Sequence, residues 1–167
     1  PSFTGGLTGY FSYDFLSYRE KTLRIDTEDT ENFKDVDLML FDKVIAFDNF
    51  RQKIILIANM RLEEGEAGYN KAKLEIRQMA DILKNGTPKN EPAGHLKSEV
   101  TPLFNEEQYC EMVEKAKRHI FEGDIFQIVL SNRLSAEYEG SLLNAYRVLR
   151  TINPSPYMFY FSSNDLE

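Results

Sequence analysis

The polar side chains best placed to do chemistry lie in the segment 123–133, GDIFQIVLSNR. If this segment is an extended strand, Gln127, Ser131 and Arg133 project from one face, with about 7 Å between residues two apart. The opposite face is wholly apolar and is expected to join the core. Buried polar groups need partners, so the polar row could line a cavity that holds a polar ligand. Spacing alone favours the alternative, in which these groups pair with neighbouring backbone or with each other.

A second candidate site is the corner 152–161, INPSPYMFYF. Pro154 and Pro156 donate no backbone hydrogen bond, so the corner cannot be a central strand of a sheet. The amides of Tyr157 and Met158 are then free for other partners, beside apolar and polarizable side chains. This combination suits an aromatic amino acid, with carbonyls for its ammonium group and amides for its carboxylate. Residue types alone favour the simpler interpretation, a rigid turn into a core strand.

Other kinds of site find little support in the sequence. The glycine-rich start, GGLTGY, has neither of the patterns typical of phosphate loops. His95 and His119 have no cysteine or second histidine at ligand spacing, so the sequence predicts no zinc site and no metal ligands in this chain. The single cysteine, Cys110, excludes an intrachain disulfide and favours a reducing cytoplasm.

The elements that position these residues follow from periodicity and turn signals. Alternating apolar residues predict four or more strands, and 3.6-residue periodicity predicts three helices. The expected strands are 7–15, 38–47, 54–58, 125–134 and 157–161, and the expected helices are 69–83, 105–123 and 141–153. Asn105 and Gln108 predict a capping box at the start of the second helix. Gly86 is expected to end the first helix in the left-handed conformation, and Gly123 is expected to end the second helix. The domain boundaries follow: a sheet portion with one helix over 1–86, a linker over 87–104, and a second portion over 105–167.

The charge balance limits the partners. Twenty basic residues stand against 27 acidic ones, a net charge of −7, which argues against nucleic acid because phosphate binding needs a basic surface. No apolar run is long enough to span a bilayer, so no membrane partner is expected. The chain begins PSFTGG and ends NDLE, and we expect it to be an internal part of a longer protein.

Two motifs together carry a family resemblance. GDIFQIVLSNR, followed twenty residues later by INPSPYMFYF, closely resembles component I, the large subunit, of anthranilate synthase, a chorismate-utilising enzyme. GGLTGYFSYD and DLMLFDKVIAFD resemble upstream segments of the same family, in the same order. The resemblance implies an α+β fold of mainly antiparallel sheets flanked by helices. It also implies conversion of chorismate and ammonia to anthranilate with loss of pyruvate, a glutamine amidotransferase partner that supplies ammonia, a Mg²⁺ ion on chorismate, and inhibition by tryptophan.

Site residues carry over only where the motifs match. In the family, the proline, tyrosine and methionine of NPSPYM contact tryptophan, which implies this role for Pro156, Tyr157 and Met158. Gln127 occupies a position where the related isochorismate synthases have a lysine that acts as a base toward water. A neutral amide cannot take that proton, and unprotonated ammonia needs such a base less, so Gln127 favours amination.

Some of the family's features are not found. A leucine-leucine-glutamate-serine segment of the tryptophan site is missing, and the magnesium-binding glutamates and the catalytic histidine are expected beyond Glu167. The chain by itself is therefore expected to be inactive. Gln127 is also compatible with aminodeoxychorismate synthase, although the NPSPYM corner favours anthranilate synthase. A non-catalytic module that senses an amino acid is the third alternative.

Overall fold

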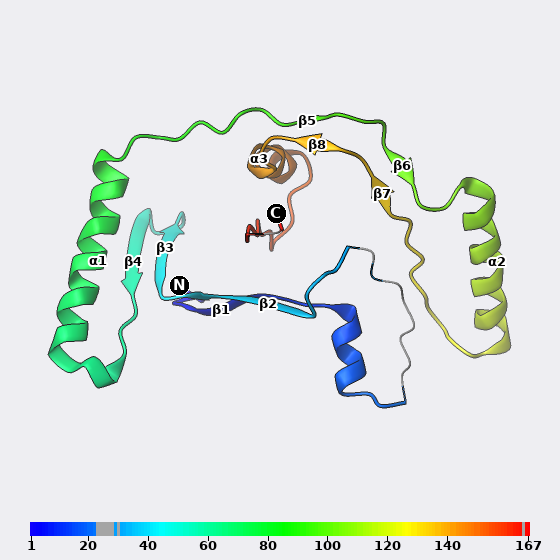
Figure 1. The fold of residues 1–167 in the computed structure, drawn as a ribbon, viewed down its shortest axis with the longest axis horizontal. Coiled ribbons are helices and arrows are strands. Elements are labelled where there is room, and N and C mark those ends of the chain that lie inside the picture. Colours follow the sequence, from blue (N-terminus) through cyan, green and yellow to red (C-terminus); the bar gives the residue numbers. More distant parts are fainter. Residues whose placement is uncertain (23–28, 30, 165) are drawn as a thin grey trace. The chain divides into compact units, whose positions relative to one another are not determined.

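The computed structural model describes residues 1–22, 29, 31–164 and 166–167. It divides into two compact units, Pro1–Pro88 and Lys89–Glu167. Their helices and strands are labelled in Figure 1. The linker predicted over 87–104 stays a prediction. This range contains two short strands, β5 (His95–Leu96) and β6 (Thr101–Pro102).

The first unit begins with an antiparallel pair, β1 (Gly6–Phe11) and β2 (Val36–Phe41), in which Gly6 faces Phe41 and Phe11 faces Val36. Gly9 is required by this pairing, because a Cβ there would overlap the carbonyl oxygen of Asp37. The strand expected over 7–15 ends at Phe11. Ser12 accepts a hydrogen bond from the Phe15 amide at 3.1 Å and caps a 3-10 helix, η1 (Tyr13–Tyr18).

A second antiparallel hairpin follows, formed by β3 (Lys43–Asp48) and β4 (Lys53–Ala58). The single strand expected over 38–47 is therefore two strands, with Asp42 between them. Asn59 joins the two hairpins: its side-chain amide donates to the carbonyl of Thr4 at 2.8 Å and to that of Asp42 at 3.2 Å. The 3-10 helix η2 (Leu62–Glu64) leads into α1 (Gly65–Asn85), which packs on β4. Gly86 ends α1 in an extended conformation, so the predicted left-handed cap is wrong there.

The second unit contains α2 (Glu106–Glu122) and α3 (Leu143–Ile152). The capping box of Asn105 and Gln108 is confirmed, and Gly123 ends α2 in the left-handed conformation with φ 84°. Two short antiparallel pairs connect the segments around α2: β5 with β8 (Tyr138–Glu139), and β6 with β7 (Leu134–Ser135).

Two predicted strands are wrong. Residues 125–133 and 157–161 belong to no strand in the structure. A strand needs a ladder of backbone hydrogen bonds to a neighbouring strand, and within the described part of the chain neither segment forms one. Their large side chains face solvent, with Phe126 93% and Phe159 85% exposed.

Few side chains are buried. Among the described residues, the buried hydrophobic ones are Ala72 and Met79 of α1 and Ala116 of α2. The apolar composition is sufficient for a core, but most of its large side chains remain exposed. No helix in the described ranges is long and apolar enough to cross a membrane.

Candidate functional site

Gln127 lies in the extended segment between α2 and β7, and its side chain is exposed. The neighbouring polar residue that anchors this segment is Asn132, which the sequence analysis did not single out. Its side chain accepts from the Phe104 amide at 3.0 Å and donates to the Phe104 carbonyl at 2.8 Å. Tyr109 of α2 donates to the carbonyl of Leu130 at 3.2 Å. These bonds hold the segment beside the start of α2 and leave Gln127 open to solvent.

The proline corner follows the end of α3 at Ile152. Pro156 is exposed, Tyr157 is 93% exposed, and Met158 is half-buried. Within the described residues, no hydrogen bond engages the amides of Tyr157 and Met158. No hydrogen bond or ring contact in that part of the chain joins the corner to Gln127, so the structure does not bring the two predicted sites together. The roles of all four residues stay predictions.

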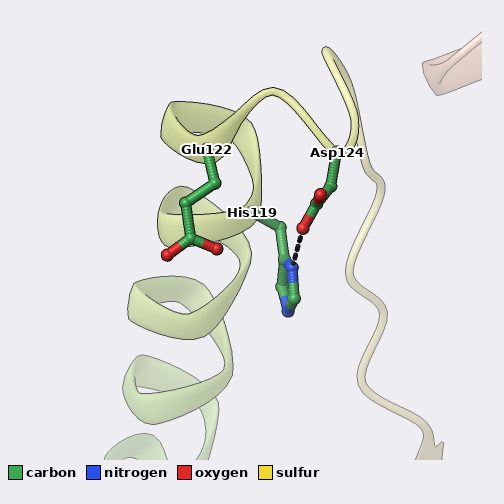
Figure 2. A group of neighbouring side chains, drawn as sticks. All are labelled: His119, Glu122 and Asp124. Atoms are coloured by element: carbon green, nitrogen blue, oxygen red, sulfur yellow. Dashed lines mark hydrogen bonds and ion pairs between the residues drawn. The ribbon is translucent and has the colours of Figure 1, made fainter.

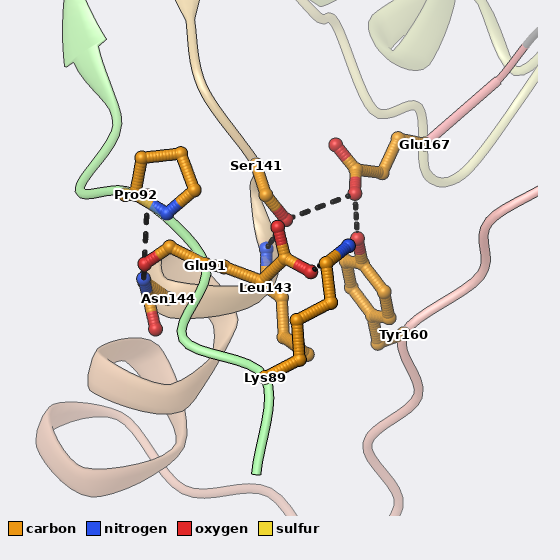
Figure 3. A network of polar contacts seen from close by, with 8 residues as sticks. All are labelled: Lys89, Glu91, Pro92, Ser141, Leu143, Asn144, Tyr160 and Glu167. Carbon is orange, nitrogen blue, oxygen red and sulfur yellow. Dashed lines mark hydrogen bonds and ion pairs between the residues drawn. The ribbon is translucent and has the colours of Figure 1, made fainter. Parts of the chain in front are cut away.

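A polar network fixes the chain beyond the corner to the start of α3 (Figure 3). The Glu167 carboxylate accepts from the Leu142 amide at 3.1 Å, from the Ser141 hydroxyl at 3.3 Å and from the Tyr160 hydroxyl. A carboxylate is favoured at a helix N-terminus, where free amides and the helix dipole attract negative charge. The ring of Tyr160 also packs against Tyr146 of α3, with 5.7 Å between centroids.

The first turn of α3 also contacts the start of the unit. Asn144 donates to the carbonyl of Glu91 at 3.2 Å, and Glu91 forms an ion pair with Lys89 at 2.8 Å. The hydrogen bond to Glu91 raises the pKa of Lys89 above its ordinary value. The hydrogen bonds of Glu167 to Ser141 and Leu142, and that of Asn144 to Glu91, were not visible in the sequence because these partners lie 25 or more residues apart.

A third cluster, at the end of α2, combines His119, Glu122 and Asp124 (Figure 2). The His119 Nδ1 atom lies 2.8 Å from a carboxylate oxygen of Asp124. One ligand atom from each of the three residues lies within 4.8 Å of the others. All three side chains are at least partly exposed.

In the first unit, ion pairs and hydrogen bonds between side chains stabilise the fold. Lys43 lies 2.9 Å from Asp42 and 3.8 Å from Glu75. The hydrogen bond between Lys43 and Asp42 lowers the pKa of Asp42 and raises that of Lys43. At the β3–β4 turn, hydrogen bonds from the backbone and side chain of Arg51 lower the pKa of Asp48.

Comparison with known families gives a match over residues 1–167 to the chorismate binding enzymes. The chain is 36% identical to the probable anthranilate synthase component 1 of Schizosaccharomyces pombe, over 100% of this chain and 35% of that protein. It is 37% identical to anthranilate synthase component 1 of Acetivibrio thermocellus, over 96% of this chain and 34% of that protein. The chain thus spans about a third of the length of these curated relatives.

A solved structure agrees with the sequence matches. The crystal structure of anthranilate synthase component I from Streptococcus pneumoniae superposes with a TM-score of 0.74 at 29% identity, covering 95% of this chain and 36% of that one. The predicted fold class, α+β with mainly antiparallel sheets and helices, is confirmed, and so is the predicted family resemblance.

Proposed function

Because this chain belongs to the family of chorismate binding enzymes, we propose that it forms part of the large subunit of an anthranilate synthase. The activity is the conversion of chorismate and ammonia to anthranilate and pyruvate, in the biosynthesis of tryptophan. The observation that carries the proposal is continuous similarity to component 1 proteins across the whole chain, at 36% and 37% identity in two of them. That similarity includes the segments that carry Gln127 and the proline corner.

The partner is a glutamine amidotransferase. The relatives are named component 1, a name that implies a second component. A subunit that aminates chorismate needs a source of ammonia, and glutamine hydrolysis in a partner supplies it. The cytoplasm is the compartment that suits this exchange of small metabolites and the single cysteine.

Gln127 is assigned to the lining of the chorismate site. Its amide can donate and accept hydrogen bonds but cannot remove a proton from water at neutral pH. This property supports amination by ammonia, which needs no such base, over hydration.

Pro156, Tyr157 and Met158 are assigned to the tryptophan site that regulates the enzyme. Three observations support this assignment: the unengaged amides of Tyr157 and Met158, the missing N–H of Pro156, and the half-buried thioether of Met158. The amides would donate hydrogen bonds to the carboxylate of the effector, and Met158 would pack against its indole ring.

The described residues do not fit the expected Mg²⁺ site. Mg²⁺ requires oxygen ligands in octahedral geometry. The one group of three or more metal-binding side chains found among the described residues includes an imidazole. The ligands for Mg²⁺ on chorismate are therefore assigned to other parts of the full-length protein.

The test uses the full-length protein that carries this sequence, assayed with chorismate, Mg²⁺ and ammonium. Fluorescent anthranilate, the ortho-amino product, is expected. A para-amino product would assign the protein to aminodeoxychorismate synthesis instead, and no product would favour an amino-acid-sensing module.

The effector site is tested by Met158→Ala. Loss of a partly buried methionine contact of about 1.4 kcal/mol is expected to weaken tryptophan inhibition about tenfold and to leave turnover without tryptophan unchanged. Met39→Ala, at another half-buried methionine in β2, is the matched control and is expected to leave inhibition unchanged. Undiminished inhibition of Met158→Ala would contradict the assignment.

A further inference from the structure

We propose that His119, Glu122 and Asp124 form a binding site for a divalent transition-metal ion, with Zn²⁺ as the best-suited probe, at the C-terminal end of α2. None of its three ligands is assigned above to the chorismate or tryptophan site, and its ion is of another class than the Mg²⁺ expected on chorismate. It does not depend on the proposed function.

Local backbone geometry brings the three side chains together. Gly123 adopts φ 84°, a conformation that costs glycine little, and reverses the chain at the end of α2. The Asp124 amide then donates to the carbonyl of His119 at 3.0 Å. This turn places the Asp124 carboxylate against the imidazole ring, while Glu122 extends from the same last helical turn, three residues after His119 (Figure 2).

The distances suit a shared ion. Zn²⁺ binds nitrogen and oxygen ligands at about 2.0–2.2 Å, so two donors on one ion lie at most about 4.4 Å apart. The three donor atoms already lie within 4.8 Å of one another. The side chains of His119 and Asp124 are 44% and 59% exposed, so small side-chain rotations can close the remaining distance without disturbing packing.

Charge also favours a cation. Glu122 and Asp124 contribute two negative charges beside a single imidazole. Glu122 has no hydrogen-bond or ion-pair partner among the described residues. The free carbonyls at a helix C-terminus add partial negative charge. The Asp124 carboxylate is hydrogen-bonded to the imidazole of His119.

The ligand types select the class of metal. Imidazole nitrogen suits zinc, copper, nickel and iron, whereas Mg²⁺ and Ca²⁺ prefer oxygen alone. Three protein ligands leave a tetrahedral ion with one open position, which water can fill. Zinc was not expected from the sequence because neither histidine has a cysteine or a second histidine at ligand spacing. The sequence signal for this site is the spacing His-x-x-Glu-Gly-Asp, in which the glycine places the second carboxylate.

The experiment measures Zn²⁺ binding to the full-length protein by isothermal titration calorimetry, with Mg²⁺ in excess to occupy all-oxygen sites. His119→Ala and Glu122→Gln are the test variants. Mutation of residues that only orient a ligand weakens binding by about 10–100-fold, so removal of His119 itself is expected to weaken it at least about tenfold. Glu122→Gln is also expected to weaken binding, and it removes no contact found among the described residues, so it should fold normally.

The controls are the other side chains of this chain that attract zinc. His95→Ala removes the second of the two histidines, and Cys110→Ser removes the only cysteine; both variants should bind Zn²⁺ as the unmodified protein does. With Co²⁺ as a spectroscopic substitute, a visible absorption band of a nitrogen- and oxygen-liganded ion should form and be absent in His119→Ala. Equal Zn²⁺ affinity of the unmodified protein and His119→Ala, or loss of binding in His95→Ala or Cys110→Ser alone, would overturn the proposal. None of these readouts requires anthranilate formation.

Discussion

At the residue scale, the carboxylate of Asp35 connects three parts of the first unit. One oxygen accepts from the Ser12 hydroxyl at 3.1 Å, and the other accepts from the Tyr18 hydroxyl at 2.8 Å. The Asp35 carbonyl accepts from the Ser12 amide at 2.8 Å. The hydrogen bond to Asp35, and then the charge of Asp35, raise the pKa of Tyr18 above its ordinary value of 10.0.

This contact predicts a pH effect. Because the pKa of Tyr18 is raised in the folded state, its stabilising contribution is fully present below pH 10.0, the ordinary value. That contribution is lost as the pH rises through the higher folded value. Tyr18→Phe should therefore lower the denaturant midpoint slightly near neutral pH, and the difference from the unmodified protein should shrink at alkaline pH.

The matched control is Tyr13→Phe, at a tyrosine of the same 3-10 helix that is 79% exposed. It has no hydrogen bond in the part of the chain that the structure describes. This variant should keep the unmodified midpoint at every pH. A pH-independent effect of Tyr18→Phe would show that the hydrogen bond to Asp35 does not carry the stabilisation.

Which single residues could be predicted depended on the sequence distance to their partners. Asn105 and Gln108 cap α2 through bonds that span three residues, so the sequence pattern was sufficient. Asn132 and Glu167 bond groups 25 or 28 residues away, and nothing in a single sequence identifies such a partner. The proline corner was identified by residue type, and its ligand is still a prediction.

At the element scale, periodicity predicted where segments are extended but not whether they are paired. Residues 125–133 alternate as a strand should, yet within the described chain they lack a neighbouring strand. The expected strand over 54–58 is confirmed as β4, which pairs with β3 across a short turn. Pairing between distant segments, such as β5 with β8, depends on tertiary contacts that a pattern cannot supply.

The pairing of β1 with β2 provides a test at this scale. Gly9→Ala introduces a Cβ that overlaps the backbone of Asp37. Overpacking of this kind costs about 1–3 kcal/mol, so we expect a lower free energy of unfolding for the full-length protein, measured by denaturant titration. Thr8→Ala, at the exposed neighbouring position, should have a much smaller effect. A stability unchanged by Gly9→Ala would mean that the two strands can separate without cost.

At the scale of the whole molecule, the main feature is the shortage of buried side chains. Large apolar residues on both hairpins and on both unpaired segments face solvent, among them Leu7, Leu40, Phe47, Phe126 and Phe159. Contiguous exposed apolar surface is typical of sites where another surface binds. The family and the order of its segments could be recognised from the sequence, because a motif can be matched without knowing which surface covers it.

The 167-residue chain by itself should therefore differ from the full-length protein. We expect it to bind a hydrophobic fluorescent dye such as ANS and to associate as its concentration rises, as measured by light scattering. It should also form no anthranilate from chorismate, Mg²⁺ and ammonium. A monomeric chain without dye binding would contradict the first expectation, and measurable anthranilate would contradict the second.

The small number of shielded side chains has a consequence during protein synthesis. The buried hydrophobic residues of the described chain are Ala72, Met79 and Ala116. Few side chains can therefore pack while this segment is leaving the ribosome. Chaperones that bind nascent chains recognise exposed apolar surfaces. We expect this segment to stay bound to them until the segments that cover it have been translated.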